Sequence, residues 1–329
     1  MTDTYPKFKA AAVAASPVYL DREATTEKAC GLIAEVAKEG AELIVFPEVY
    51  LPGYPYWIWL GSPTWGGKYF HELFKNAVEL DSPTVDTLCE AARKANVHVV
   101  MGIDERDGGT LYNTLLYISR DGEVLGRHRK LQPTHVERTV WGKGDGSDLR
   151  VHKTDVGTIG GLICWEHTMD LVRYAMLVLG EEIHCAVWPG VDTLHHNPHS
   201  IIFKDVTEAA ARHHATAGQV FVINVQSPIS QDMIDKMEMT DQPDMISVGG
   251  GWTAIINPVG QIIGGPLEGE GIVYAEIDLE ERIGAKFACD SVGHYARPDV
   301  VRLLMDLEPQ HVAQAGSLSD TGLTDNEED

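Results

Sequence analysis

One of the five cysteines stands in surroundings suited to covalent chemistry. Cys164 follows Gly160-Gly161 at a predicted strand-to-helix junction, where backbone N–H groups and a helix dipole favour a thiolate. Cys289 lies in an irregular stretch, and its role stays open. The remaining cysteines lie in helical or strand patterns, where a free cysteine is usually a small buried hydrophobic residue: Cys30, Cys89 and Cys185. Cys164 is therefore the candidate nucleophile.

A cysteine nucleophile needs a base or a cation beside it, because an ordinary thiol is mostly protonated at neutral pH. Glu48 follows a predicted buried strand over residues 42–46, and open α/β sheets bind ligands at such strand ends. Lys130 ends the second arm of a predicted hairpin over residues 110–129. Both are candidates, although these residues taken alone fit a surface charge better, since Glu and Lys are usually exposed.

Strands and helices alternate along the chain, which predicts an α/β fold with mixed sheets. We expect one domain over residues 1–309 and an acidic, disordered tail over residues 310–329. Residues 50–67 are predicted to form a long aromatic loop. The predicted strands cover residues 9–15, 42–46, 97–104, 158–164, 183–187, 220–226 and 271–277, with hairpins about residues 120–122 and 257–260, and the predicted helices cover residues 21–40, 82–95, 168–179 and 200–218.

The net charge is −23, from 26 basic and 49 acidic residues. It argues against nucleic acid and anionic lipid as partners and favours a neutral small molecule. The longest apolar runs, residues 42–46 and 220–225, are far shorter than the roughly 20 residues of a membrane span. The first residues lack the order of a signal peptide, so we expect a cytoplasmic protein.

The histidines suggest a metal site only weakly. The HExxH motif is absent, and Pro198 interrupts the first histidine group, so we expect surface or interface histidines and no metal or cofactor. The clustered histidines are His195, His196, His199, His213 and His214.

Four blocks of residues, in this order, resemble the nitrilase superfamily of carbon–nitrogen hydrolases over about residues 8–305. They are Phe46-Pro47-Glu48 with Pro52-Gly53-Tyr54-Pro55; Arg129-Lys130-Leu131 with Pro133-Thr134-His135-Val136-Glu137-Arg138 and Gly142-Lys143-Gly144-Asp145-Gly146; Gly160-Gly161-Leu162-Ile163-Cys164-Trp165-Glu166; and Gly293-His294-Tyr295-Ala296-Arg297-Pro298-Asp299. Trp165, directly after the cysteine, is typical of the nitrilase branch. Met169-Asp170-Leu171 lacks a proline often found there, a difference that bears on the shape of the pocket.

The resemblance implies a four-layer αββα arrangement on dimerisation, with mixed β-sheets flanked by helices. It implies a catalytic triad of Glu48, Lys130 and Cys164, with Glu137 as a second active-site glutamate. It also implies a homo-oligomer of at least two chains, which in this family often extends into a spiral. Substrate contacts are expected from Trp165, Tyr54, Trp57, Trp188 and His135.

The function expected from these residues is hydrolysis of a nitrile to the carboxylic acid and ammonia through a thioimidate and a thioester on Cys164. Three alternatives stay open. Cyanide hydrolysis would use the same triad. An aliphatic amidase is less consistent with Trp165, because amidase-like branches often have Tyr-Asp after the cysteine. A catalytically idle assembly protein would not need the intact triad.

Overall fold

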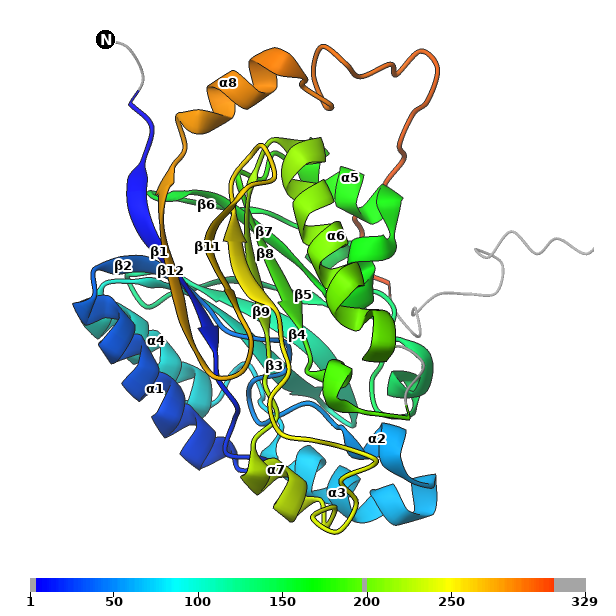
Figure 1. The fold of residues 1–329 in the computed structure, drawn as a ribbon. Coiled ribbons are helices and arrows are strands. Elements are labelled where there is room, and N and C mark those ends of the chain that lie inside the picture. The colour runs from blue at the N-terminus through cyan, green and yellow to red at the C-terminus, as the bar shows by residue number, and fades with distance from the viewer. Residues whose placement is uncertain (1–3, 197–199, 311–329) are drawn as a thin grey trace, which may run out of the picture.

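Two six-stranded β-sheets form the middle of the molecule in a computed structural model that describes residues 4–196 and 200–310 (Figure 1). The first sheet has the spatial order β12 (Gly271–Asp278), β1 (Lys7–Ala14), β2 (Ala41–Val45), β3 (His98–Asp107), β4 (Thr110–Ile118) and β5 (Val124–Arg129). The second has the order β11 (Ile262–Leu267), β10 (Thr253–Ile256), β9 (Phe221–Gln226), β8 (Ile183–Trp188), β7 (Gly157–Ile163) and β6 (His152–Thr154).

Both sheets are mixed, as predicted. In the first sheet β1, β2 and β3 are parallel, and in the second β7, β8 and β9 are parallel. The other neighbours pair antiparallel, including the predicted hairpin of β4 and β5. Parallel strands end at a common edge, and β2 and β7 each lead there into a candidate residue, Glu48 and Cys164.

The inner faces of the two sheets share one apolar core. Leu43 and Val45 of β2 belong to the same buried cluster as Ile163 of β7 and Val187 of β8. Burial of each such side chain stabilises the fold by about 1.5–3 kcal/mol.

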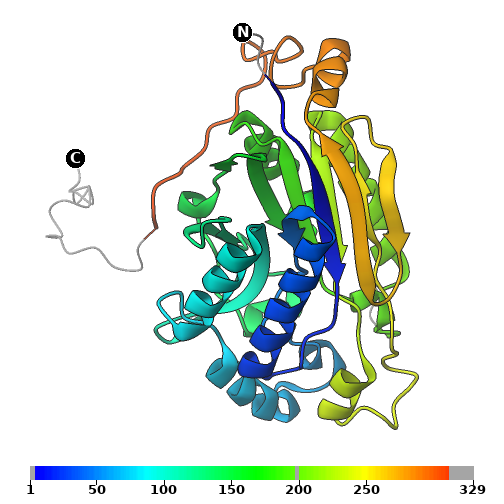
Figure 2. The same cartoon turned by 90° about the vertical axis from the view of Figure 1, so that its left-hand side faces the viewer.

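Helices cover the outer faces (Figures 1 and 2). On the first sheet, Ile33 and Leu88 from two helices pack with Ile44 of β2, and on the second, Ala211 packs with Ala186 of β8. The α, β, β and α layers thus lie within one chain and need no second copy to form. How copies of the chain pair stays a prediction. The helices are α1 (Arg22–Lys38) and α4 (Pro83–Ala95) on the first sheet, α5 (Asp170–Val178) and α6 (Ser200–Gly218) on the second, and the peripheral α2 (Trp57–Leu60), α3 (Pro63–Asn76), α7 (Gln231–Lys236) and α8 (Glu281–Ala288).

The prediction of a loop over residues 50–67 is wrong, because α2 and the start of α3 lie there. Ser62 caps α3 by accepting a hydrogen bond from the N–H of Trp65, with Pro63 in the first turn. Tyr69 and Leu73, four residues apart, form its buried face. The sequence does contain this cap and this four-residue spacing, but the prediction rested on the many aromatic residues of the segment instead.

The segment after α8 runs along the surface as turns and extended chain (Figure 2). Leu303, Met305 and Leu307 pack against a small cluster that includes Leu149 and Leu162, so the segment is anchored by apolar contacts. Most of the predicted tail, residues 311–329, lies outside the described residues.

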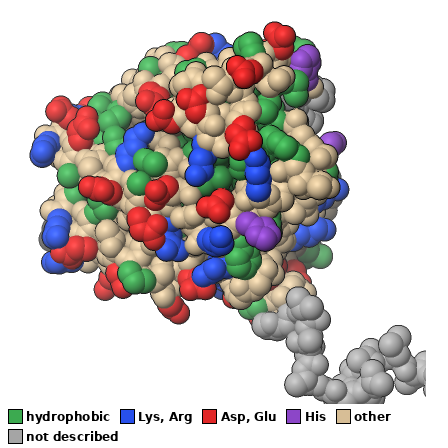
Figure 3. Space-filling model, turned by 90° about the horizontal axis from the view of Figure 1, so that it is seen from below, with side chains coloured by type: hydrophobic (Ala, Val, Ile, Leu, Met, Phe, Trp, Pro, Cys, Tyr) green, Lys and Arg blue, Asp and Glu red, His purple; other side chains and the backbone are tan. Residues whose placement is uncertain are grey.

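Acidic and basic side chains are interspersed on the face seen from below (Figure 3). Within residues 4–196 and 200–310, no helix has the length and apolar character that a membrane crossing requires.

Candidate active site

Glu48, Lys130, Glu137 and Cys164 come together at the edge where β2, β5 and β7 end. The ammonium of Lys130 lies 2.9 Å from Oε1 of Glu48 and 2.8 Å from Oε2 of Glu137. An oxygen of each glutamate and the sulfur of Cys164 all lie within 4.8 Å of one another. Each of the four residues is 1% exposed. Residues 116 positions apart in the sequence thus form one buried cluster, which is the candidate active site.

Lys130 supplies the positive charge of this cluster. Burial by itself lowers the pKa of the ammonium, but the carboxylates of Glu137 and Glu48 outweigh it and hold that pKa well above its usual value. The side chain is therefore a fixed cation between two acids. It already pairs with both carboxylates that a metal ion at this cluster would have to bind.

Glu48 has one engaged oxygen and one free oxygen. Oε1 accepts hydrogen bonds from Lys130 and, at 2.6 Å, from the side-chain amide of Asn113. Oε2 is buried and has no hydrogen-bond partner among the described residues. Burial raises the pKa of Glu48 to about 7, since it outweighs the effect of Lys130. A carboxyl group with that pKa and a free oxygen can both take up and return a proton near neutral pH.

The surroundings of Cys164 favour the protonated form of its thiol. Burial, followed by the charge of Glu48, raises its pKa well above the usual value, and Lys130 only partly offsets this. The prediction of a thiolate stabilised by a helix dipole is wrong, because Cys164 begins a single 3₁₀ turn, Cys164–Thr168, and α5 begins only at Asp170. Cys164 also has a φ of +54°, a strained conformation for a residue other than glycine.

Glu166 joins the ends of the strands that lead to Lys130 and Cys164. Its carboxylate accepts hydrogen bonds from the backbone N–H groups of Leu131, at 2.8 Å, and Ile163, at 2.7 Å. His128 lies 2.9 Å from the same carboxylate and forms a buried ion pair with it. Burial works against ionisation, but His128 and the N–H groups keep the pKa of Glu166 below its usual value. No role for Glu166 was predicted from the sequence, although it lies two residues after the nucleophile.

Glu137 is held on both of its oxygens. Tyr54 donates a hydrogen bond to Oε1 at 2.7 Å, and the N–H of Thr134 donates to Oε2 at 2.7 Å. Tyr54 in turn accepts a hydrogen bond from Nε1 of Trp59 at 3.0 Å. Glu137 therefore fixes the position of Lys130 and connects it to the aromatic residues around the site.

A cavity of about 10 Å³ lies over the Cys164 sulfur. Tyr54 and Trp165, two of the residues predicted to contact substrate, line it, and their role in binding stays a prediction. The other lining residues are Trp59, Thr134, Glu137, Cys164, Pro189, Val191 and Phe203. Apolar and aromatic side chains thus surround a few polar groups, which is typical of a site for a small neutral molecule.

The other three residues expected to contact substrate do not line this cavity. Trp57 is buried against Tyr69 and borders a neighbouring hollow of about 420 Å³. Trp188 is fully buried and donates a hydrogen bond to Asn224 at 2.7 Å. His135 stacks on Trp59 with 5.7 Å between ring centroids, one layer behind the cavity wall. Their role in substrate binding stays a prediction.

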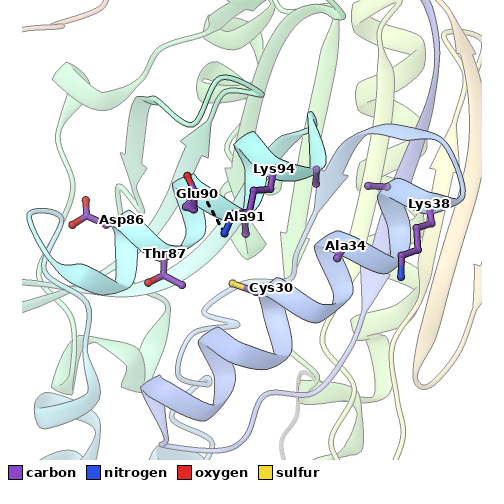
Figure 4. A pocket seen from close by; sticks show the side chains of 10 residues that line it. Cys30, Ala34, Lys38, Asp86, Thr87, Glu90, Ala91 and Lys94 are labelled. Carbon is purple, nitrogen blue, oxygen red and sulfur yellow. Dashed lines mark ion pairs between the residues drawn. The ribbon is translucent and has the colours of Figure 1, made fainter.

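A larger hollow of about 750 Å³ lies on the outer face between α1 and α4 (Figure 4). Cys30 borders it together with the ion pair of Glu90 and Lys94. None of the four clustered residues reaches it. This hollow is larger than the cavity at Cys164, so a search by volume alone would not lead to the candidate active site.

A second buried group, formed by Glu181, His184 and His214, has ligand-type atoms within 4.8 Å of one another. The expectation that the clustered histidines lie at the surface is wrong for His214, which is 1% exposed. It is confirmed for His195, His196 and His213, which are exposed, and His199 lies outside the described residues. His214 lies on the face of α6 that packs on the sheet, and its position in the predicted helix could have indicated its burial.

Comparison with known proteins agrees with this geometry. The sequence profile of the carbon–nitrogen hydrolase family matches residues 9–287. A nitrilase of Bacillus sp. (strain OxB-1) is 42% identical over 306 residues, which cover 92% of this chain and 89% of that protein. An aliphatic nitrilase of Rhodococcus rhodochrous is 44% identical over 301 residues, which cover 90% and 82% of the two chains. A carbon–nitrogen hydrolase of Helicobacter pylori G27 has the same fold, with a TM-score of 0.73, 21% identity and coverage of 89% and 97%.

The chain therefore belongs to the carbon–nitrogen hydrolase family, the nitrilase superfamily, and is a hydrolase of carbon–nitrogen bonds other than peptide bonds. Within the superfamily it falls in the nitrilase branch. The family prediction made from the four sequence blocks is confirmed.

Proposed function

We propose that the protein hydrolyses a nitrile to the carboxylic acid and ammonia, with Cys164 as nucleophile, Glu48 as general base and acid, and Lys130 as the cation that stabilises developing charge. The observation that carries the proposal is the geometry of the buried cluster: the Cys164 sulfur lies within 4.8 Å of a carboxylate oxygen of Glu48, Oε2 of Glu48 has no partner among the described residues, and the Lys130 ammonium lies 2.9 Å from Oε1. The names of the two relatives, a nitrilase and an aliphatic nitrilase, support this choice of substrate.

The first half of the reaction forms a thioimidate. The Cys164 sulfur attacks the nitrile carbon while its proton passes to Oε2 of Glu48. Glu48 then returns that proton to the nitrile nitrogen, which gives a neutral C=NH group bonded to sulfur. Lys130 and the backbone N–H of Trp165 donate hydrogen bonds as negative charge develops, and loss of one such donor typically costs about 10²–10³ in kcat.

The second half consumes two waters. Glu48 takes a proton from the first water as its oxygen adds to the thioimidate carbon, and it passes that proton to nitrogen. Collapse of the tetrahedral intermediate expels ammonia and leaves a thioester on Cys164. A second water, activated in the same way, releases the carboxylic acid and restores the thiol. A positioned acid or base of this kind contributes about 10²–10⁴-fold.

The small cavity favours cyanide hydrolysis as a second candidate function. A cavity of about 10 Å³ has room for about one water molecule. Hydrogen cyanide is the nitrile that comes nearest to that size, whereas a larger organic nitrile requires the lining side chains to move. The aliphatic amidase and the idle assembly protein are less consistent with the relatives and with the intact buried cluster.

We also propose a homo-oligomer of at least two chains in a reducing compartment such as the cytoplasm. Leu171 and Ile201 are exposed apolar side chains on neighbouring helices of the outer layer, which supports a contact surface there. The five cysteines are free in the structure, which suits a reducing environment.

Ammonia release from a panel of compounds tests the function. The panel contains cyanide, an aliphatic nitrile, an aromatic nitrile, an arylacetonitrile and the matching amides. Cys164→Ala is the inactive variant, and Cys30→Ala is its matched control, since it makes the same change on the outer helix α1. Organic nitriles turned over by the wild type and Cys30→Ala but not by Cys164→Ala are the expected result. Cyanide alone as substrate would establish the second candidate, and amides alone, or an active Cys164→Ala, would overturn the proposal.

A further inference from the structure

Three histidines and one glutamate form a continuous buried chain of hydrogen bonds that ends on the Cys164 backbone. Nδ1 of His167 lies 2.7 Å from the carbonyl oxygen of Cys164, and Nε2 of His167 lies 2.9 Å from Nε2 of His184. Nδ1 of His184 lies 2.8 Å from Oε2 of Glu181, whose other oxygen is bonded to Nε2 of His214. All four residues are at most 1% exposed.

We propose that this chain of His214, Glu181, His184 and His167 positions the Cys164–Trp165 peptide group for catalysis. The inference rests on the proposed function, because it concerns the same nucleophile. His167 follows β7, His184 lies in β8 and His214 lies in α6, so the chain connects α6 to the candidate site by way of β8 of the second sheet (Figure 1).

The direction of each hydrogen bond follows from counting protons. A carbonyl oxygen only accepts, so Nδ1 of His167 carries a hydrogen. Burial, followed by the charge of His184, lowers the pKa of His167 well below its usual value, so the ring is neutral and its Nε2 accepts. Nε2 of His184 must then donate to it.

The remaining proton lies between His184 and Glu181. Burial by itself raises the pKa of Glu181, but His184 and His214 outweigh it and lower that pKa to about 2. Glu181 is therefore ionised, and one proton lies on the hydrogen bond between its Oε2 and Nδ1 of His184. Every donor in the chain has one acceptor, so the hydrogen bond from His184 fixes the orientation of the His167 ring. Trp188 also stacks on its ring, with 4.8 Å between centroids.

This arrangement acts on the reacting atoms through one peptide group. The carbonyl that accepts from His167 and the N–H of Trp165 belong to the same peptide unit, and the Trp165 N–H favours the ionised form of the Cys164 thiol by lowering its pKa. A hydrogen bond to the carbonyl polarises the unit and strengthens the N–H as a donor. It also holds Cys164 at its strained φ of +54°. His167 is thus a positioning residue, not a catalytic one.

A bound divalent ion is the competing account of the same atoms. Glu181, His184 and His214 offer ligand-type atoms within 4.8 Å of one another. A metal there would replace the proton on His184, since a ligating imidazole nitrogen is deprotonated. The hydrogen bonds that join Glu181 to His184 and His214 would then be replaced by bonds to the metal.

Nuclear magnetic resonance can observe this peptide group by itself. Cys164-Trp165 is the only Cys-Trp pair in the sequence, so carbonyl carbon-13 cysteine with nitrogen-15 tryptophan gives a single correlation in the full-length protein. His167→Phe keeps a ring but removes the donor, and we expect the Cys164 carbonyl resonance to move to lower frequency. His167→Asn keeps a donor near Nδ1, and Glu181→Gln keeps the order of hydrogen bonds with a neutral His184. Both should leave the resonance near its wild-type position.

His184→Phe provides a second disruptive variant in case His167→Phe does not fold, and we expect a smaller shift in the same direction. His98→Phe is the matched control, because His98 is a buried histidine on the other sheet, bonded to Asp155. An unmoved resonance in both His167→Phe and His184→Phe, or an equal shift in His98→Phe, would overturn the proposal. One equivalent of metal per chain, lost in Glu181→Gln, would overturn it as well.

Kinetics separate positioning from general destabilisation. With folded protein, we expect His167→Phe to lower kcat roughly ten- to hundredfold with little change in KM, since small misplacements of reacting groups cost about that much. His167→Asn should restore most of the loss. Equal loss in the two variants, or none in His167→Phe, would contradict the inference. A wild type inactive on every nitrile would instead refute the proposed function, and the resonance experiment would still test the hydrogen-bond chain.

Discussion

Replacing Lys130 with methionine tests the electrostatics of the candidate site, because Lys130 is the ammonium that lies between two buried carboxylates. Its side chain is fully buried and pairs with Glu48 at 2.9 Å and Glu137 at 2.8 Å. Methionine has a similar volume and no charge, so the variant leaves the two acids together without a counterion. Removing one partner of a buried ion pair costs about 3–5 kcal/mol. We expect the free energy of unfolding at neutral pH to fall by about that amount.

The loss should depend on pH, with a sign set by Glu48. The pKa of Glu48 is about 7 even with Lys130 present, above the ordinary value of 4.5, and it rises further without the ammonium. A carboxyl whose pKa is higher in the folded state favours folding below its ordinary pKa, and this contribution is lost as the pH rises through the folded-state value. The difference in stability between wild type and Lys130→Met should therefore grow from pH 5 to pH 8.

Urea unfolding followed by circular dichroism, at one protein concentration and several pH values, measures this difference. Lys68→Met is the matched control, because Lys68 pairs with Glu238 at 2.6 Å on the surface. An exposed pair contributes at most about 1 kcal/mol. A Lys130→Met protein no less stable than Lys68→Met, or a deficit that does not change with pH, would refute the electrostatic reasoning.

Three further predictions concern the same site. The value of kcat/KM should rise through about pH 7 as Glu48 loses its proton. Glu48→Gln should lower kcat about 10²–10⁴-fold. An unchanged pH profile in Glu48→Gln would contradict the role of Glu48 as the base. Glu166→Gln should lower both the melting temperature and kcat, because an amide replaces a carboxylate that accepts from two backbone N–H groups. The expected cost in stability is about 1–3 kcal/mol. Glu182→Gln is the control, and equal kcat values in the two variants would count against a positioning role of Glu166. Trp59→Ala removes a wall of the 10 Å³ cavity and should raise kcat/KM for an aromatic nitrile relative to cyanide; an unaltered ratio would show that Trp59 does not limit substrate size.

Much of the fold followed from local patterns in the sequence. The helix predicted over residues 21–40 is α1, which begins after its N-cap Asp21 and ends before Gly40, whose φ is +84°. The hairpin about residues 120–122 turns at Gly122, with a φ of +78°. The position of Glu48 after a buried strand was predicted in the same way. Local rules succeed here because each feature is fixed by a few neighbouring residues.

The features that were not predicted depend on residues distant in the sequence. Asn113 contacts Glu48 across 65 positions, and Glu181 contacts His214 across 33. Neither partner belongs to a motif, and a polar residue in a strand or loop gives no sign of what it meets in the folded chain. The protonated state of Cys164 was likewise missed, because it depends on burial and on the charge of Glu48, which only the packed structure brings together.

Detection of the covalent intermediate is the direct test of Cys164 as the nucleophile. Wild-type protein is mixed with an organic nitrile, quenched in acid during turnover, and digested for mass spectrometry, with Cys164→Ala treated alongside. The account predicts one adduct, on the peptide that contains Cys164, with the mass of the acyl or imidoyl group, and no adduct or ammonia from Cys164→Ala. Steady ammonia release by Cys164→Ala, or an adduct on another cysteine of a turning-over enzyme, would contradict it.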